Sequence, residues 1–383
     1  MTDSAFEQIR AVAATADESE RRALVASLRN LASSFEDAGE ITHRIGCAAL
    51  ETAAVEIGFD LGLFKHLVEA GSPINVSDAA SKSRADPALV LRIFRYLAAI
   101  GTVSETGPGQ FAANNVTNTL ASDMGVAAVR HYFYTATPPY TILPAFLKKT
   151  GYKNPSDDLH SPFQDAFHTS LHPYAWFADP ANAKNLTYFN DFMALRREPD
   201  LSWLSVYPVE DMSANWPADQ AIYVNIGGSI GHQCAQFKAA FPTLPGRVIL
   251  QDLPHSIAHA LPTPGVENMA HNFWDPQPIR HAKFYYMRAV CHNHPDHKVL
   301  DLLKITKEAM SPESILLLDE MILPETGVHA ESAVLDMTMM TAFASAERTE
   351  AQWRVLVEGA GLRLVKTYVY NKAGYESVMD VRL

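Results

Sequence analysis

The sequence is poor in the residues that build disulfide frameworks or membrane spans. It contains three cysteines in 383 residues, Cys47, Cys234 and Cys291, and their separations match neither a disulfide scaffold nor a thiolate metal site. No apolar run approaches the roughly 20 residues that cross a bilayer. Residues 1–22 lack the apolar core of a signal peptide. We therefore expect a protein of a reducing, cytoplasmic compartment, with no membrane partner and no resident metal.

Positive charge is scarce as well. Lysine and arginine number 31 against 43 aspartates and glutamates, so the net charge is −12 and the isoelectric point about 5.6. An acidic surface repels phosphate groups, which disfavours nucleic acid and anionic membranes as main partners. Hydrophobic residues make up 48% of the chain, enough for a large core, and its length favours more than one domain. A small molecule is the partner that we expect.

The most informative stretch is 221–254. An apolar run from Ala221 to Ile226 predicts a buried strand, and a second run, at 248–250, ends in Asp252. Between them lie a helical pattern and three glycines that break the first strand, Gly227, Gly228 and Gly231. Glycines let the backbone approach a ligand, and an acid at the next strand end can accept hydrogen bonds from both ribose hydroxyls. The unit is typical of a nucleotide-type cofactor site.

Strands and helices alternate after this unit. Apolar runs predict strands at 283–290, 315–320, 365–370 and 378–383, with helices at 296–309 and 350–360. This alternation predicts a doubly wound α/β domain, which we place at 207–383. Ligands of such domains lie at the carboxyl ends of the strands. His292 and Glu320, like Asp252, fall at predicted strand ends.

The preceding residues predict two further parts. Residues 1–125 carry helical periodicity with broad apolar faces, and 58–120 have the pattern of a winged helix in which Asp86 and Pro87 begin a helix. We interpret this part as a dimerisation domain, because its acidic setting disfavours DNA. Residues 126–206 are rich in aromatic side chains and histidines, and we predict a helical linker that lines the substrate cleft.

A series of ordered segments resembles the S-adenosylmethionine (SAM)-dependent O-methyltransferases of the caffeic-acid type, and the fungal branch best. The resemblance covers nearly the full length. Its segments are Val-Asn-Ile-Gly-Gly-Ser-Ile-Gly at 224–231, Gln-Asp-Leu-Pro at 251–254, His-Asn-Phe-Trp at 271–274, the stretch 287–296, and the later segments 319–324, 335–337 and 347–349.

This resemblance implies a Rossmann-like SAM-binding domain, an N-terminal dimerisation domain, a homodimer and SAM as the cofactor. It makes His292 the general base that removes a proton from an acceptor hydroxyl, with Glu320 and Glu347 orienting its ring. Histidine suits that role because its pKa lies near neutrality, and a carboxylate behind the ring selects its tautomer. The implied acceptor clamps are Met337 and Met340, and the implied SAM contacts are Gly227, Gly228, Gly231, Asp252, Asn272, Phe273 and Arg288.

The sequence departs from the family pattern beside the implied base. Asparagine replaces the usual aspartate at three positions, Asn225, Asn272 and Asn293, and His294 stands where the family has tryptophan. Ser229 replaces the middle glycine of the SAM turn. Asparagine can still hydrogen-bond a nucleoside, so these changes are compatible with SAM binding. Loss of a negative charge next to His292 changes the electric field on that histidine.

The resemblance leaves two functions open. The first is methyl transfer to a hydroxyl of an aromatic, polyketide or pyridone secondary metabolite. The alternative is a SAM-bound pericyclase, which dehydrates a pyridone alcohol and guides hetero-Diels–Alder or Alder-ene steps while the methyl stays on SAM. In that case His131 and Arg197 are the implied substrate contacts. A non-catalytic scaffold or a DNA-binding regulator is disfavoured by the intact His292, Glu320 and Glu347.

Overall fold

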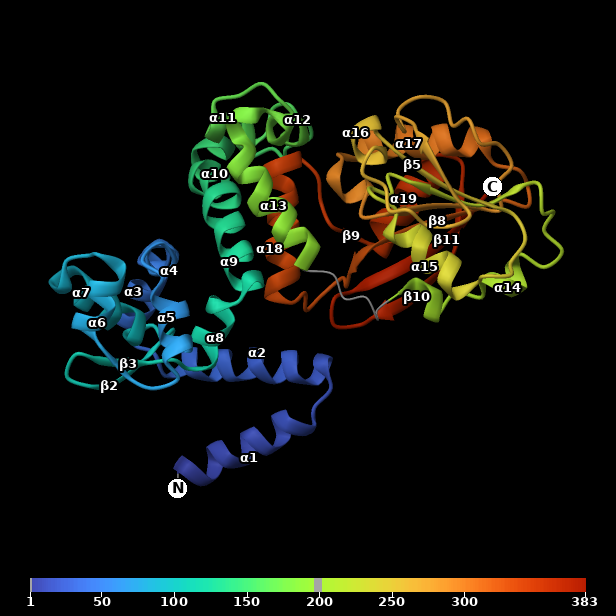
Figure 1. Cartoon of the computed structure of the whole chain (residues 1–383). Coiled ribbons are helices and arrows are strands. Elements are labelled where there is room, and N and C mark those ends of the chain that lie inside the picture. Colours follow the sequence, from blue (N-terminus) through green and yellow to red (C-terminus); the bar gives the residue numbers. More distant parts are fainter. Residues whose placement is uncertain (1, 196–201) are drawn as a thin grey trace. The chain divides into compact units, whose positions relative to one another are not determined.

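The structure is a computed structural model that describes residues 2–195 and 202–383 (Figure 1). The described chain forms two compact units. The first comprises residues 2–144 and 173–195, and the second comprises residues 145–172 and 202–383. The units therefore interleave along the sequence, because residues 145–172 pack with the second unit although first-unit residues flank them. The predicted domain limits at 125 and 206 stay predictions.

The first unit is mainly helical and contains a small antiparallel sheet of order β1-β3-β2. Its elements are α1 (Thr2–Thr15), α2 (Glu18–Phe35), α3 (Ala38–Gly46), α4 (Ala48–Asp60), α5 (Leu63–Ala70), β1 (Ile74–Asn75), α6 (Val76–Ser83), α7 (Pro87–Ala99), β2 (Ser104–Gly107), β3 (Gln110–Ala112), α8 (Asn115–Ala121), α9 (Asp123–His131), η1 (Tyr132–Ala136), the first part of α10 (Thr137–Lys149), α12 (Pro173–Ala178), η2 (Pro180–Asn182) and α13 (Ala183–Leu195).

Local chemistry explains where α7 begins. The Asp86 side chain accepts hydrogen bonds from the backbone N–H groups of Ala88 and Leu89, at 2.8 and 3.0 Å, and Pro87 occupies the first turn. These contacts satisfy N–H groups that lack partners within the helix. Strands β2 and β3 form an antiparallel ribbon that β1 extends on the β3 side, while a winged-helix identity stays a prediction.

The second unit contains the large sheet. Its elements are α11 (Pro162–Phe167), η3 (Trp203–Ser205), α14 (Val209–Met212), β4 (Ala221–Ile226), α15 (His232–Ala240), β5 (Arg247–Asp252), α16 (Pro254–Ile257), β6 (Val266–Ala270), β7 (Phe284–Arg288), η4 (Cys291–Asn293), α17 (Asp296–Ala309), β8 (Ile315–Leu323), α18 (Ala330–Phe343), β9 (Arg348–Thr349), α19 (Glu350–Gly359), β10 (Arg363–Asn371) and β11 (Glu376–Arg382).

The strands of this sheet lie in the order β10-β11-β8-β7-β4-β5-β6, and β9 pairs with β8 off that path. Strands β8, β7, β4, β5 and β6 pair in parallel, whereas β11 is antiparallel to both β8 and β10. The chain adds β5 and β6 on one side of β4 and then places β7 on the other side. The crevice between the carboxyl ends of β4 and β7 is therefore the expected ligand position.

Helices cover both faces of the sheet (Figure 1). Leu316 and Leu318 of β8 belong to the core cluster that includes Val299 of α17 and Trp353 of α19. The alternate residue Leu317 belongs to the cluster that includes Phe237 of α15. Side chains alternate across a strand, so a strand buried on both faces is apolar throughout. This explains why the central strands appear in the sequence as continuous apolar runs.

The structure confirms the predicted fold class, an α/β Rossmann-like domain after a helical N-terminal region. Two of the differences concern β6 and β8. Strand β6 was not predicted, because it is an edge strand whose Glu267 and Asn268 are exposed. Glu320 lies inside β8 rather than at its end, since the strand continues to Leu323 through pairing with β11 and β9. None of the described helices has both the length and the apolar composition that a membrane span requires.

Candidate active site

The glycine positions of the turn after β4 have no room for side chains. A Cβ atom at Gly228 would lie 2.4 Å from Asn225 Nδ2 and 2.5 Å from Leu250 Cδ1. Gly227 and Gly231 have φ angles of 66° and 95°, which side chains disfavour. The turn is closed by a hydrogen bond from the Gly228 N–H to the Gln251 carbonyl at 3.1 Å. The glycines therefore let the backbone of the turn lie close against Leu250 of β5 and Val290.

Asp252, the last residue of β5, is joined directly to this turn. Its Oδ2 accepts a hydrogen bond from the Ser229 N–H at 2.7 Å, and its Oδ1 accepts one from the Leu253 N–H at 2.8 Å. A carboxylate has about four acceptor positions, so two of these bonds leave capacity for a diol. A Cβ at Gly227 would lie 3.8 Å from the Phe273 ring, which places that ring beside the turn.

His292 lies in η4, just after β7. Its Nδ1 is 2.7 Å from Glu347 Oε1, and the histidine side chain is 18% exposed while that of Glu347 is 1% exposed. Glu347 is positioned in turn by its own N–H, which donates to Asp336 Oδ1 of α18 at 2.9 Å. The structure thus brings together two predicted residues that are 55 positions apart in the sequence.

Glu320 of β8 contacts the same loop through its carboxylate. Its Oε1 accepts a hydrogen bond from the Cys291 N–H at 2.9 Å. Its Oε2 is buried and has no hydrogen-bond partner within residues 2–195 and 202–383. The pKa of Glu320 is raised to about 7, mainly by burial; the nearby Glu347 acts in the same direction and His292 in the opposite one. Near neutral pH this carboxyl group can hold a proton beside the histidine.

Comparisons with known proteins place this geometry in a family. Residues 219–363 match the family model of the O-methyltransferase domain. The chain is 37% identical to demethylsterigmatocystin 6-O-methyltransferase of Aspergillus parasiticus over 367 residues, which is 96% of this chain and 94% of that protein. It is 35% identical to O-methyltransferase lepI of Aspergillus flavus over 369 residues, covering 95% and 94% of the two chains.

The chain belongs to the O-methyltransferase family. This confirms the family that the sequence motifs predict, and with it SAM as the cofactor. Among solved structures, the LepI complex with SAM superposes with a TM-score of 0.89 at 34% identity and covers 100% of this chain and 99% of that chain. A structure named "A Pericyclic Reaction enzyme" matches with the same values.

The residues of this O-methyltransferase-family chain fit a nucleoside cofactor. The turn after β4 carries glycines where a side chain would clash, Asp252 offers acceptors, and Phe273 offers an aromatic face nearby. Asn272 is exposed, and its Oδ1 accepts a hydrogen bond from the Trp274 N–H at 3.2 Å. That role needs an acceptor, which aspartate and asparagine both provide, so the departure at this position is locally neutral.

Asn293 is different, because its role needs a donor. Its Nδ2 donates to the Ala289 carbonyl at 2.9 Å, and Ala289 has a left-handed φ of 49°. An ionised aspartate could not donate, and its charge would face that carbonyl. Asparagine therefore stabilises the sharp bend that leads into the His292 loop. Replacing it by aspartate would disturb the loop whichever reaction the protein catalyses.

Arg288 ends β7 and contacts two acids. Its Nη2 is 3.3 Å from Glu376 Oε1, and its Nε is 3.9 Å from Asp319 Oδ2. Asp319 also accepts hydrogen bonds from the hydroxyls of Tyr286 and Tyr370, at 2.5 and 2.7 Å. Burial raises the pKa of Asp319 to about 6, while Arg288 lowers it. Arg288 belongs to a buried polar cluster that its sequence motif did not reveal, and its contact with SAM stays a prediction.

The predicted substrate contacts fall in three places. Met337 and Met340 are one turn apart on α18, the helix whose Asp336 holds Glu347, and Met337 is 44% exposed. His131 ends α9 in the first unit. Arg197 lies outside the described residues.

His131 sits among aromatic rings. Its ring centroid is 5.5 Å from those of both Phe189 and Phe192 of α13, and 5.9 Å from that of Tyr132. Its Nδ1 is buried and lacks a hydrogen-bond partner in the part of the chain that the structure describes. Burial lowers the pKa of His131 to about 4, so the ring is neutral at physiological pH.

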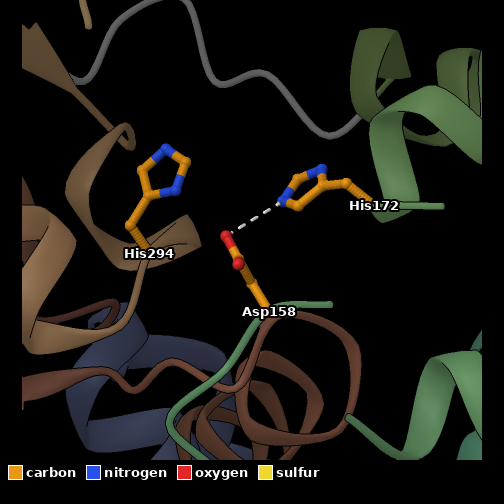
Figure 2. A group of neighbouring side chains, drawn as sticks. All are labelled: Asp158, His172 and His294. Carbon is orange, nitrogen blue, oxygen red and sulfur yellow. Dashed lines mark ion pairs between the residues drawn. The ribbon is translucent and has the colours of Figure 1, made fainter. Parts of the chain in front are cut away.

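A second polar cluster adjoins the His292 loop. Figure 2 shows Asp158, His172 and His294 pointing toward one another, with His172 Nε2 3.6 Å from Asp158 Oδ2. The ring nitrogens and carboxylate resemble a metal-ligand set. However, Lys298 Nζ lies 2.8 and 2.7 Å from the two Asp158 oxygens, so an ammonium group already holds the cation position. Burial lowers the pKa of His294 to about 3, which keeps its ring neutral.

Sequence reasoning missed several residues of this site. Ser345, Arg348 and Asp336 contact the His292 loop or its carboxylate, and the Asp158–Lys298 pair lies beside His294. Ser345 carried no motif signal. Arg348 and Asp336 lie inside quoted motifs, so the motifs could have pointed to them. Their partners are distant in the sequence, and that is why spacing alone did not assign their contacts.

Replacing Glu320 by glutamine tests the buried acid. The folded chain binds this proton more tightly than the unfolded chain, so ionising Glu320 destabilises the native state as pH rises from about 5 to 8. Glutamine keeps an acceptor for the Cys291 N–H and never ionises. The Glu320→Gln variant should therefore gain stability relative to the wild type as pH rises, by up to about 3 kcal/mol at pH 8. Urea unfolding at both pH values measures this difference.

The matched control is Glu325→Gln, in the exposed turn after β8. Exposure gives this carboxylate no burial cost, so the substitution should leave the pH dependence as it is. If the stability difference between Glu320→Gln and the wild type is the same at pH 5 and at pH 8, Glu320 is ionised throughout this range.

Proposed function

We propose that the protein transfers the methyl group of SAM to a hydroxyl of an aromatic, polyketide or pyridone secondary metabolite, with His292 as the general base. The single observation that carries this proposal is the 2.7 Å contact between His292 Nδ1 and the buried Glu347 carboxylate. Support for an oxygen acceptor comes from the relatives, whose names describe O-methyltransferases.

The contact with Glu347 selects the useful form of the imidazole. A proton on Nδ1 donates to the carboxylate, so in the neutral ring Nε2 is the basic nitrogen. An acceptor hydroxyl placed at Nε2 can pass its proton to the ring, and Glu347 then stabilises the imidazolium. Glu320 adds a second carboxyl group, which accepts a hydrogen bond from the Cys291 N–H of the loop.

SAM, when bound, supplies an electrophilic methyl group on a positively charged sulfur. The residues proposed to hold it are Gly227, Gly228 and Gly231 of the glycine turn, Asp252, Asn272, Phe273 and Arg288. Met337 and Met340 would hold the acceptor from α18 in this scheme. Alignment of the acceptor oxygen contributes much of the rate in such a reaction, because it removes the entropy of bringing two reactants together.

A label experiment tests the reaction itself. Purified protein is incubated with methyl-labelled SAM and a panel of fungal phenols and pyridone alcohols, and both label and product mass are followed. We expect label in the product and one demethylated cofactor for each turnover. His292→Ala should lower turnover by about 10²–10⁴-fold, the usual contribution of a general base.

His297→Ala is the matched control, since His297 is an exposed histidine on α17. It should retain wild-type turnover. Conversion of a substrate with SAM at catalytic amounts, and with no label in the product, would overturn methyl transfer.

Asp252 has a separate binding test. We expect the Asp252→Ala variant to bind SAM about 10- to 100-fold more weakly, because a charge-assisted hydrogen bond contributes about 1.5–3 kcal/mol. Asp252→Asn keeps an acceptor for the Ser229 N–H and separates damage to the turn from loss of the ribose contact. Calorimetry measures both. Equal affinity in the wild type and in Asp252→Ala would remove Asp252 from the proposed site.

A pericyclase is the second candidate, and a specific observation favours it. The match at TM-score 0.89 and 34% identity to "A Pericyclic Reaction enzyme" extends over 100% of this chain. In this alternative His292 and the neutral His131 would hydrogen-bond the substrate, and the cofactor charge would polarise its carbonyl. SAM would be required and not consumed, which is the outcome that the label experiment separates from methyl transfer.

We also propose that the protein is a homodimer formed through its N-terminal helices. Helix α2 has no buried residue, and its Leu31 and Phe35 are 52% and 78% exposed. Ile45 of α3 is 66% exposed. An isolated chain would leave this apolar surface in water. An obligate interface of about 2,000 Å² or more would cover it.

Light scattering tests the assembly. The wild type should have twice the chain mass of 42.2 kDa. The double substitution Leu31→Glu and Phe35→Glu should give monomers, because it places charge on the apolar face of α2. Val355→Glu, at a 71% exposed position on α19, is the control. A monomeric wild type at micromolar concentration would contradict the proposal.

A further inference from the structure

The backbone around His292 is held by two side chains from a single short segment. Ser345 Oγ lies 2.6 Å from the His292 carbonyl and 2.7 Å from the His294 carbonyl. Arg348 Nη1 donates to the Cys291 carbonyl at 3.3 Å, and Nη2 donates to the His294 carbonyl at 2.9 Å. The carbonyl groups of Cys291, His292 and His294 therefore each have a hydrogen-bond partner outside the loop.

Arg348 is built into this position. The residue is 2% exposed, and its guanidinium also bonds Asp296 Oδ1 through Nε at 2.9 Å and Nη2 at 2.7 Å. The guanidinium carbon lies 5.3 Å from the centre of the Trp353 ring. A planar fork with five N–H donors can reach several acceptors at once, which the point charge of a lysine cannot reproduce.

The same segment also carries Glu347, the carboxylate that meets the His292 ring. Arg348 pairs with Ile322 where β9 runs parallel to β8, so the segment is tied to the central sheet. Ring and main chain of His292 are thus positioned from residues 345–348 together. A shift of the loop relative to this segment would change the 2.7 Å contact directly.

We propose that Arg348 and Ser345 are positioning residues that hold His292 against Glu347. The inference concerns the geometry of the histidine, and only its effect on turnover rests on the proposed function. Neither residue needs to touch substrate or cofactor. Their contribution is to keep the imidazole within hydrogen-bond distance of its carboxylate while the ring gains or loses a proton.

This positioning has an electrostatic consequence. Within residues 2–195 and 202–383, the charged or titratable groups near the ring include Glu347 and Arg348 of the 345–348 segment, Glu320 of β8, Asp336 of α18 and His294 of the same loop. A carboxylate in contact favours the imidazolium, so loosening the Glu347 contact lowers the pKa of His292. The positive charge of Arg348 acts against the carboxylate and lowers the pKa of His292. A test of positioning must therefore keep the charge of residue 348.

Two charge-preserving variants satisfy that condition, Ser345→Ala and Arg348→Lys. We expect the pKa of His292, measured by NMR of ¹⁵N-labelled protein, to fall by about 1 in each variant, as expected for a weakened ion contact. With an active substrate, kcat should fall about 10-fold or more through misalignment. SAM affinity should stay within about twofold of the wild type, because the glycine turn and Asp252 are separate from this segment.

Matched controls separate positioning from general stability. Ser213→Ala removes a buried hydroxyl that bonds the Val209 carbonyl at 2.7 Å, and Arg354→Lys alters a partly exposed arginine on α19. Both should leave the pKa of His292 unchanged. Ser345→Thr keeps the hydroxyl and should restore the wild-type pKa. If Arg348→Lys does not fold, Asp296→Glu moves the carboxylate that bonds the guanidinium without changing the charge, and it should lower the pKa in the same direction.

The outcomes decide the proposal. Folded Ser345→Ala and Arg348→Lys proteins with the wild-type pKa of His292 would overturn it. The NMR measurement needs no turnover, so it also separates the two hypotheses. A lowered pKa together with an absence of methyl transfer would remove the proposed function and leave the positioning role in place.

Discussion

The reversal of strand order at β4 is the constraint on which the candidate site depends. The chain adds β5 and β6 on one side of β4 and returns to place β7 on the other. The carboxyl ends of these parallel strands therefore lie along one edge of the sheet. The glycine turn follows β4, Asp252 ends β5, and the His292 loop follows β7. The residues proposed to hold the cofactor and the candidate base lie along the same edge because of this topology.

Burial of carboxyl groups shapes the electrostatics of that edge. Glu320 and Asp319 are adjacent in β8 and belong to different polar clusters, one below the His292 loop and one around Arg288. Burial raises the pKa of both. Charges interact strongly where water is excluded, so a small displacement of His292 changes its proton affinity. This explains why the loop is anchored at so many points.

The departures from the family pattern acquire physical meaning in the loop. Asn293 donates to the carbonyl of the strained Ala289, and His294 packs as a neutral ring beside Phe273, Trp274 and the Asp158–Lys298 pair. The two substitutions remove one negative charge and one indole ring, and these contacts keep the loop in place. The same framework can thus serve proton removal or hydrogen bonding to a carbonyl. The family assignment holds for both reactions.

Local patterns in the sequence determined the parts of the protein that depend on neighbouring residues. The apolar run at 221–226, the helix at 296–309 and the start of α7 at Pro87 were predicted at their observed bounds, because periodicity and helix capping act over a few residues. Family motifs located His292, Glu347 and the glycine turn. The polar edge strand β6 had no such signal.

Tertiary structure decided which side chains meet. Ser345 and Arg348 reach the His292 loop across 51 to 57 positions, and Lys298 reaches Asp158 across 140. The extension of β8 beyond Glu320 depends on pairing with β11 and β9. No local propensity encodes such contacts, because they form only when the sheet brings distant segments to one edge. The sequence by itself determined most of the elements and the candidate residues, and folding decided their partners, their burial and therefore their proton affinities.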